Sequence, residues 1–367
     1  MNLYQDYFIP LLHDAVSAGA SDVHLSAGNT VKFRIHGQIE PYGNKVLTVR
    51  DTSLFAANIL VSARKSSHDD IANYLNHLHD EDCSFGVSGV GRFRVNVSRQ
   101  RGSLCLVMRL IPETPPDFVS LNLPGVLAQI ALENRGLVLI TGATGCGKSS
   151  TLAAIINHIN QNRQVKIITI EDPIEYLIRD EKASIVQREV GSDTESFAFA
   201  LRAALRQDPD VIMVGEMRDH ETTDIALKAA ETGHLVLSTL HTVDVAKTIS
   251  RIVGIFDQGE QMSVRYRLAE SLRAIISQTL LPRQDRSGRI VSTEIMRATL
   301  TIKECIEDPK KTGQIRDYLE KGRDQYGMHS FDQSLLDLYR KNIISLEVAK
   351  SASSSPADFD RNLAFGA

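Results

Sequence analysis

The chain of 367 residues contains no tryptophan and only four cysteines. Cys83, Cys105, Cys146 and Cys305 are far apart and form no CxxC pair, so neither a zinc site nor a disulfide framework is expected. No apolar run approaches the roughly 20 residues of a membrane-spanning helix. The N-terminal segment lacks a basic region and is interrupted by Pro10, which does not fit a signal peptide. These absences predict a protein of the reducing cytoplasm with no direct membrane span.

The chain also lacks a strong excess of charge of either sign. The formal net charge is −4 and the pI about 6.3, which gives no electrostatic reason to expect a nucleic-acid partner. Hydrophobic residues make up 43% and charged residues 23%, as in ordinary globular proteins. The length is sufficient for two domains with full cores.

What the sequence does contain is a complete G-x-x-x-x-G-K-[ST] phosphate loop, GATGCGKS, at residues 142–149. An apolar stretch at 136–141 precedes it and a helical pattern at 150–159 follows, which is the setting that the motif requires. Its glycines let backbone N–H groups surround phosphates at a helix N-terminus. Lys148 is expected to reach the β- and γ-phosphates and Ser149 to ligate Mg²⁺. The residues assigned to nucleotide binding here are Gly142, Ala143, Thr144, Gly145, Cys146, Gly147, Lys148, Ser149 and Ser150.

Residues 1–112 predict a small α+β domain. Its segments SDVHLS, VKFRIHG, GRFRVNV and LCLVMRLI have strand character, several of them alternating apolar and polar residues, as half-buried strands of an antiparallel sheet do. The domain ends at IPETPP, whose prolines favour an extended linker over 113–120.

Residues 121–350 predict a second, α/β domain. Apolar strands at 136–141, 165–170, 211–214 and 235–240 are separated by helical segments, which indicates βαβ units and a parallel-rich central sheet. After Gly259 we expect mostly helix to about Lys350, and the polar segment 351–367 is expected to be a loose tail.

Acidic residues follow two of these strands. In TIEDPIE, residues 169–175, Glu171 or Glu175 is a candidate for activating water, although a solvated acidic turn is the alternative. In DVIMVGE, residues 210–216, Glu216 matches a Walker B acid that coordinates Mg²⁺ through water.

Histidine and arginine complete the candidate chemistry. His241 follows the strand at 235–240 and would project toward the γ-phosphate, unless it is a structural histidine. Five arginines, Arg92, Arg94, Arg99, Arg101 and Arg109, lie near the end of the first domain. Arginine supplied across an interface accelerates phosphoryl transfer, whereas the alternative is an ordinary basic sheet face.

The segments ASDVHLS, RFRVN, GATGCGKSSTLA, TIEDPIEY, QREVGSDTESF, LRAALRQDPDVIMVGEMRD and AAETGHLVLSTLHT together resemble the secretion and pilus motor ATPases, most of all those of type IV pilus retraction. The resemblance extends over about residues 15–340. It implies a PAS-like N-terminal domain, a RecA-like P-loop ATPase domain and a cytoplasmic homohexamer. It also implies that ATP hydrolysis with Mg²⁺ drives pilus retraction and twitching motility through a platform protein of the inner membrane.

By motif position, the resemblance assigns catalytic roles to Glu175, Glu216, His241, Arg94, Arg101 and Arg109, with Arg99 as the alternative to Arg101. Glu216 and Ser149 are the expected metal ligands. Glu171 and His234 are assigned to nucleotide binding, His234 as the first residue of the family's histidine motif.

One segment departs from the family. Retraction ATPases carry a helical AIRNLIRE motif, and the aligned segment here is TIKECIED, in which Glu307 replaces an arginine. Lys303 and Glu307 are expected to form an i,i+4 pair. The departure leaves open an accessory retraction paralogue or a motor of a related secretion system. A nucleotide-gated scaffold with little turnover is a further alternative from a different class.

Overall fold

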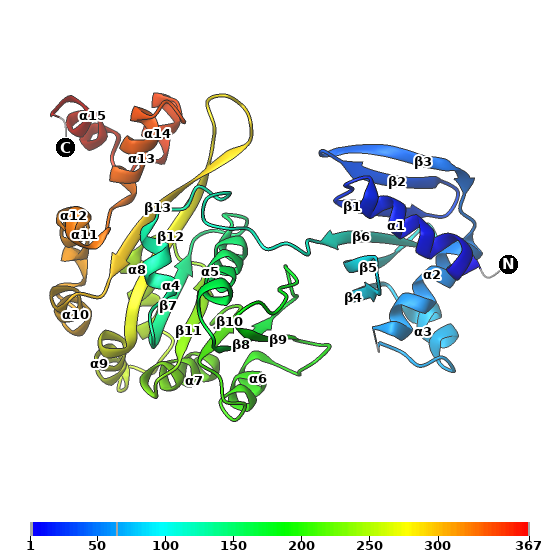
Figure 1. The fold of residues 1–367 in the computed structure, drawn as a ribbon, viewed down its shortest axis with the longest axis horizontal. Helices are drawn as coiled ribbons and strands as arrows, with labels where there is room; N and C mark the ends of the chain where they lie inside the picture. The colour runs from blue at the N-terminus through cyan, green and yellow to red at the C-terminus, as the bar shows by residue number, and fades with distance from the viewer. Residues whose placement is uncertain (1–2, 64, 366–367) are drawn as a thin grey trace. The chain divides into compact units, whose positions relative to one another are not determined.

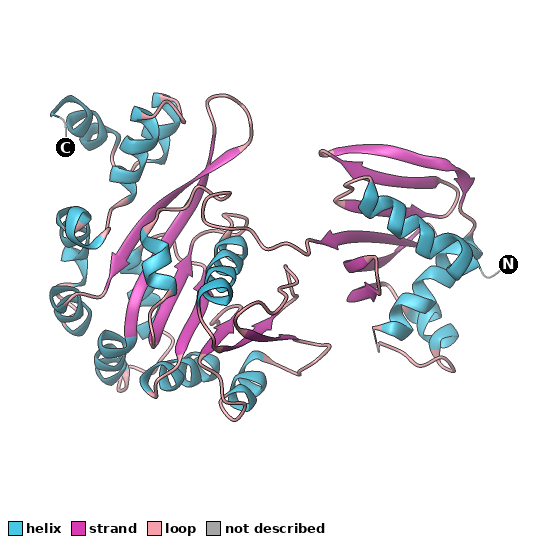
Figure 2. Cartoon of the chain, viewed as in Figure 1, coloured by secondary structure: helices cyan, strands magenta, loops and turns pink. Residues whose placement is uncertain are grey.

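The computed structural model describes residues 3–63 and 65–365 and divides into two compact units. The smaller unit comprises Met1–Thr114 with Pro173–Leu177, and the larger comprises Pro115–Asp172 with Ile178–Ala367. Each unit has its own sheet (Figures 1 and 2), and each sheet borders its own cluster of buried hydrophobic residues.

The smaller unit is an antiparallel sheet covered by helices. Its elements are η1 (Tyr4–Phe8), α1 (Ile9–Ser17), β1 (Asp22–Ser26), β2 (Thr30–Ile35), β3 (Gln38–Val46), α2 (Val49–Ser62), α3 (Ile71–His77), β4 (Asp80–Val87), β5 (Gly91–Gln100) and β6 (Ser103–Ile111). The strand order is β3-β2-β1-β6-β5-β4. Alternate residues of β5 and β6 are buried, so one face of the sheet packs on the core and the other carries polar residues. The rings of Phe8 and Phe55 stack in this core at 4.5 Å between centroids.

The larger unit alternates strands and helices. Its elements are α4 (Val126–Ala131), β7 (Gly136–Thr141), α5 (Lys148–Asn162), β8 (Lys166–Glu171), β9 (Ser184–Glu189), α6 (Phe197–Ala204), β10 (Val211–Val214), α7 (His220–Glu231), β11 (Leu235–Leu240), α8 (Val245–Val253), α9 (Gln261–Ser271), β12 (Leu272–Pro282), β13 (Arg289–Arg297), α10 (Leu300–Glu307), η2 (Thr312–Gln314), α11 (Ile315–Lys321), α12 (Arg323–Tyr326), α13 (Phe331–Arg340), α14 (Leu346–Ala352) and α15 (Pro356–Phe365).

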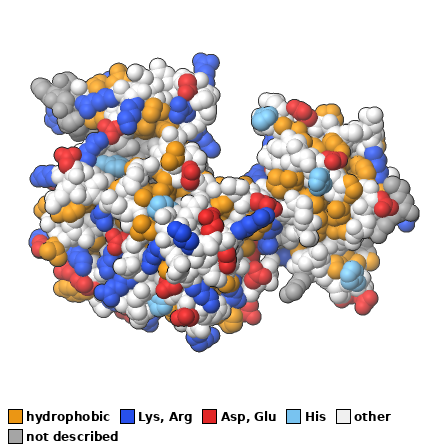
Figure 3. Space-filling view, in the orientation of Figure 1, with side chains coloured by type: hydrophobic (Ala, Val, Ile, Leu, Met, Phe, Trp, Pro, Cys, Tyr) orange, Lys and Arg blue, Asp and Glu red, His pale blue; other side chains and the backbone are white. Residues whose placement is uncertain are grey.

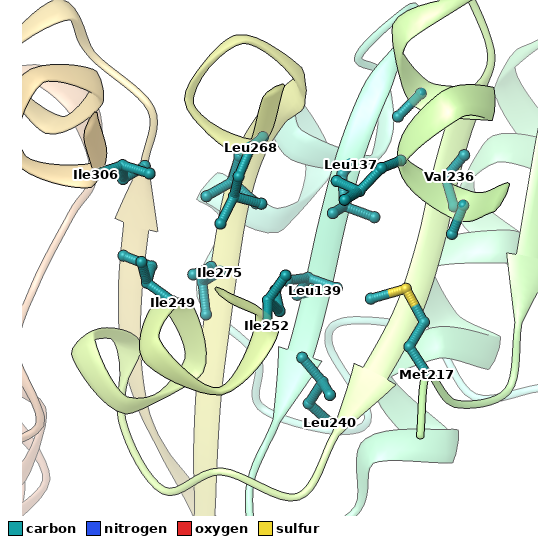
Figure 4. Packing of buried hydrophobic residues seen from close by; sticks show 14 of the residues in the cluster. Leu137, Leu139, Met217, Val236, Leu240, Ile249, Ile252, Leu268, Ile275 and Ile306 are labelled. Atoms are coloured by element: carbon teal, nitrogen blue, oxygen red, sulfur yellow. The ribbon is translucent and has the colours of Figure 1, made fainter. Parts of the chain in front are cut away.

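Its seven-stranded sheet has the order β13-β12-β7-β11-β10-β8-β9. The strands from β12 to β9 pair in parallel, and only the β12–β13 hairpin is antiparallel. Every residue of β7 and β11 is buried, which explains why both are continuous apolar runs. Helices cover both faces: Ile249 and Ile252 of α8 share one cluster with Leu139 of β7 (Figure 4), while α4 and α5 pack on the other face.

The expectation of helix from Gly259 to Lys350 was wrong over β12 and β13. Helix α9 ends at Ser271 and β12 begins at Leu272 with no intervening turn residue. The sequence therefore contains no glycine or proline signal at the change from helix to strand.

Two further expectations differ from the structure at the C-terminal end. The segment expected to be a loose tail contains α15, in which Phe359 is fully buried in a cluster with Leu336 and Ile344. Burial of this aromatic ring stabilises the folded segment, although the sequence around it is polar. In α10, Lys303 pairs with Glu270 of α9 at 3.3 Å rather than with Glu307.

Within residues 3–63 and 65–365, no helix is both long enough and apolar enough to cross a bilayer. On the face of the larger unit that Figure 3 shows, acidic and basic side chains are interspersed.

Candidate functional site

The carboxyl ends of β7, β10 and β11 meet at one edge of the parallel sheet. Thr141, the last residue of β7, pairs with Leu240, the last residue of β11, and Val214 of β10 pairs with Ser238. The segments that follow these strands therefore lie side by side at the edge where ligands bind in open α/β sheets.

The phosphate loop after β7 adopts a conformation that requires glycine. Gly142, Gly145 and Gly147 have φ values of 144°, 78° and 92°. A Cβ on Gly142 would lie 2.3 Å from the carbonyl oxygen of Gln278 and 2.6 Å from Cys146 Sγ. The loop thus packs too closely on β12 to carry any side chain at this position.

Gln278 of β12 links the phosphate loop to helix α5 through two hydrogen bonds. Its Nε2 donates to the Cys146 carbonyl at 2.8 Å, and its Oε1 accepts from Thr151 Oγ1 of α5 at 2.9 Å. The side chain is almost fully buried, so both hydrogen bonds lie away from water. Sequence reasoning missed this residue, although a lone glutamine in the apolar run of β12 is a signal for a buried polar contact.

Lys148 is the first residue of α5 and lies against the loop. Its Nζ donates to the carbonyl oxygens of Gly142 at 2.9 Å and Ala143 at 3.0 Å, and lies 3.5 Å from Nδ1 of His241. Burial lowers the pKa of this ammonium, although nearby Cys146 opposes the shift. A largely buried cation that donates to two carbonyl oxygens is matched to an anionic ligand.

Glu216 and His241 form a row of polar contacts with Lys148. His241 Nε2 lies 3.4 Å from Glu216 Oε2, and Arg218 pairs with the other carboxylate oxygen. The Glu216 side chain is only 12% exposed, so these contacts are partly shielded from solvent. The structure thus brings together three residues that the sequence assigned to catalysis or phosphate binding.

Beside Glu216 lies a hollow of about 350 Å³. Its charged lining consists of Asp172, Glu195, Glu216, Arg218, Asp219 and Glu221. Five carboxylates against one guanidinium would repel a phosphate, so the anion site is the glycine loop rather than this hollow.

Two assigned residues do not join the site. Glu171 is the last residue of β8, but its side chain is buried and its Oε1 accepts hydrogen bonds from Thr169 Oγ1 at 2.6 Å and Gln187 Nε2 at 3.1 Å. His234 precedes β11 and contacts the Ala229 carbonyl at 2.9 Å. It lies at the amino end of that strand, roughly 20 Å along the sheet from His241.

Ser149 and Glu175 remain predictions. Ser149 is exposed in the first turn of α5, where its hydroxyl would face a metal bound beside the phosphates. Glu175 belongs to the short segment that packs with the smaller unit.

The arginines separate into different environments. Arg94 and Arg109 lie opposite each other on β5 and β6. Arg99 donates to the carbonyls of Leu75, Asn76, Leu78 and Gly102, which is a structural role. Arg101 lies at the turn of the β5–β6 hairpin with φ 50°, roughly 20 Å along the strand from Arg94. The structure therefore brings Arg94 and Arg109 together and leaves Arg101 apart.

The segment after His241 is anchored by a buried acid. Glu294 of β13 accepts a hydrogen bond from the backbone N–H of Val245, the first residue of α8, at 2.9 Å. Burial raises the pKa of Glu294 to about 7, and Asp244 adds to the shift while Arg316 opposes it.

A parallel sheet with a glycine phosphate loop, a buried lysine and a strand-end glutamate defines a P-loop nucleotide-binding protein of the RecA-like class. The family model described as type II/IV secretion system protein matches residues 4–362, and the chain belongs to this family. The predicted resemblance and fold class are confirmed.

Individual relatives agree with this membership. The type IV pilus retractation ATPase PilT of Pseudomonas aeruginosa is 40% identical over 349 residues, covering 95% of this chain and 98% of that protein. The type IV pilus ATPase PilU of the same organism is 38% identical over 355 residues, covering 96% and 90%. The crystal structure of a pilus retraction motor PilT with bound ADP is similar at a TM-score of 0.85 and 42% identity, covering 96% and 98% of the two chains.

The Glu294 anchor predicts a specific pH dependence of stability. The folded-state pKa of about 7 lies above the ordinary value of 4.5, so the proton favours the folded state, and that stabilisation is lost as pH rises toward 7. Glu294→Gln removes this titration. Relative to wild type, its free energy of unfolding should therefore increase by about 2 kcal/mol between pH 5.5 and 8.5. Urea unfolding of both proteins at each pH measures this, and a difference independent of pH would contradict it.

Proposed function

We propose that this chain is a cytoplasmic motor ATPase that hydrolyses ATP to drive retraction of a type IV pilus, and hence twitching motility. The observation that carries the proposal is the convergence of Lys148, His241 and Glu216 beside a glycine phosphate loop. Family membership and the likeness to the retraction motor support the choice of pilus retraction.

In the proposed site, the phosphate loop binds ATP. Lys148 leaves the loop carbonyls to contact the β- and γ-phosphates, which replace those dipoles with full negative charge. Ser149 and Glu216 would hold Mg²⁺, directly or through water, and a bound ion would supply positive charge beside the phosphates. His241, already in contact with both Lys148 and Glu216, is placed to respond to the γ-phosphate.

Glu175 is the proposed base that orients the attacking water, because Glu171 is buried and one of its carboxylate oxygens already accepts two hydrogen bonds. Arg94 and Arg109 supply guanidinium groups to the phosphates as negative charge develops on them. Arg101 would act, if at all, at a different contact, because it lies far along the hairpin from this pair.

The active assembly is proposed to be a homohexamer at the cytoplasmic face of the inner membrane. Its partner is an integral platform protein of the pilus machine, and nucleic acid is not expected to bind. The acidic balance of the chain agrees with the last point, since nucleic-acid affinity depends on basic charge.

The second candidate function is an accessory retraction ATPase. The similarity to PilU, at 38% identity over nearly the whole chain, supports this candidate. Glu307, where the retraction motif has arginine, is the sequence feature that makes the distinction worth testing.

Substitution of Lys148 and Glu175 tests the chemistry. Lys148→Ala removes the charge that binds the phosphates, whereas Glu175→Ala removes only the water-orienting base. Phosphate release should be abolished in both, but Glu175→Ala should still bind ATP while Lys148→Ala binds it poorly. Equilibrium binding of a labelled nucleotide separates the two. Glu181→Ala, at an exposed acid later in the sequence, is the control and should leave turnover unchanged. Equal loss of affinity in both variants would contradict the role of Glu175.

Deletion of the gene tests the biological role. Cells without a retraction motor should accumulate surface pili that do not retract and should lose twitching. Loss of twitching while pili still retract would instead indicate an accessory motor. Cells without any pili would contradict retraction and indicate extension. Electron microscopy and live imaging of labelled pili give the readout.

Glu307 lies on the last turn of α10, where Ile302 and Ile306 are fully buried and Glu307 is partly exposed. Restoring the family charge with Glu307→Arg should change the free energy of unfolding by no more than about 0.5 kcal/mol, as for other surface changes. If this face contacts a partner, twitching should change while ATP turnover does not. Glu347→Arg, at an exposed acid on α14, is the charge-matched control. Unchanged twitching would place Glu307 on ordinary helix surface.

A further inference from the structure

A row of charged side chains crosses one face of the six-stranded sheet in the smaller unit. Arg94 of β5 lies opposite Arg109 of β6. On the other side of Arg109, Asp22 of β1 lies opposite it, and Arg34 of β2 lies opposite Asp22. Paired residues on neighbouring strands point to the same face, so the four side chains are neighbours. The residues that alternate with them, such as Val23 and Val95, face the core.

Asp22 is the buried member of the row. Its side chain is 6% exposed, whereas the side chains of its partners Arg34 and Arg109 are partly and largely exposed. Its Oδ1 accepts from Arg109 Nε at 2.9 Å, and its Oδ2 accepts from Ser21 Oγ at 2.8 Å. Burial by itself would raise the pKa of this carboxyl, but the hydrogen bonds from Ser21 and Arg109 outweigh it and lower the pKa. Asp22 is therefore ionised and bound to one end of the Arg109 guanidinium.

The opposite end of Arg109 is directed to solvent. Its side chain is 68% exposed, and within the described residues only its Nε makes a hydrogen bond. The guanidinium carries four further N–H donors on its two Nη atoms. Asp22 thus fixes the orientation of the side chain without using the donors that would bind a carboxylate or phosphate in bidentate fashion.

Arg94 adds a second guanidinium group beside that of Arg109. Like charges directly opposite on paired strands are destabilising, and Arg94 has no ion pair with any residue that the structure describes. Among the residues that the structure describes, Asp22 is the carboxylate that pairs with Arg109, and it does so on the side away from Arg94. Two adjacent guanidinium groups, one of them held in place, form a strong site for an anion.

We propose that Asp22 is a positioning residue: it holds Arg109 so that the Nη groups of Arg109, together with Arg94, bind a phosphate of the nucleotide. This inference rests on the proposed role of the two arginines in ATP hydrolysis. Asp22 itself does not touch the nucleotide. Its contribution is orientation, because an arginine that is already ordered loses less side-chain entropy when the phosphate binds.

A double-mutant cycle on the full-length protein, with ATP turnover as the readout, tests the proposal. Asp22→Ala should lower kcat by roughly 10- to 100-fold with KM nearly unchanged, because a misplaced arginine weakens the interaction that develops in the transition state. Asp22→Asn keeps an oxygen acceptor for Nε and should retain more of the turnover. In an Arg109→Ala background, Asp22→Ala should cause no further loss, because both changes remove the same interaction.

Arg34 provides the matched control. Its Nε lies 3.7 Å from the same carboxylate, on the side away from Arg109. Arg34→Gln removes a charge beside Asp22 without touching Arg109, so kcat should stay within about twofold of wild type. Thermal unfolding of every variant identifies any that fail to fold, in which case Asp22→Asn replaces Asp22→Ala in the cycle.

The outcomes separate the two proposals. Wild-type turnover in Arg109→Ala would overturn the proposed role of the arginine itself. A large loss in Arg109→Ala, combined with an equal loss from the Asp22 change in both backgrounds, would overturn the positioning role and leave the arginine role intact. An Asp22 variant with wild-type or higher turnover would also overturn it, because the carboxylate would then be dispensable or would restrain the arginine.

Discussion

The contact between the phosphate loop and strand β12 is the constraint on which the site depends. Gly142 approaches the backbone of Gln278 so closely that no side chain is tolerated, and the Gln278 amide then bridges the loop to Thr151 of α5. These hydrogen bonds are buried, so breaking one leaves an unsatisfied polar group at a cost of about 1–3 kcal/mol. These contacts join the loop, α5 and β12 directly, and Lys148 is the first residue of that helix.

Much of the larger unit could be predicted because its central strands are buried on both faces. Continuous apolar runs at β7, β10 and β11, each followed by a glycine, an acid or a histidine, identify both the parallel sheet and its carboxyl edge. The failure at β12 and β13 has a local cause. A helix that passes directly into a strand leaves no break in the apolar pattern, and a short apolar run does not distinguish the two structures.

The neighbours of a site residue could be predicted where they follow from its position in a strand. They could not be predicted where they depend on contacts between segments that are distant in the sequence. His241 and Glu216 follow adjacent parallel strands, so their proximity follows from topology. The role of Arg99 does not, because it depends on carbonyl groups at the end of α3 that no local pattern indicates. Strand alternation does carry part of the answer: Arg94 and Arg99 are an odd number of residues apart on β5, and so they point to opposite faces.

Strands β12 and β13, which the sequence patterns missed, also contact the segments at the carboxyl edge of the parallel sheet. On β12, Ser277 contacts Thr141 at the end of β7, and the adjacent Gln278 holds the phosphate loop. On β13, Glu294 lies directly opposite Ser277 and holds the segment that follows His241. The same β13 strand continues after two residues into α10, the helix of Glu307. The phosphate loop and the segment after His241 are thus both bonded to a hairpin that is continuous with this helix, which places the departure from the retraction motif on the same stretch of chain as two anchors of the candidate site.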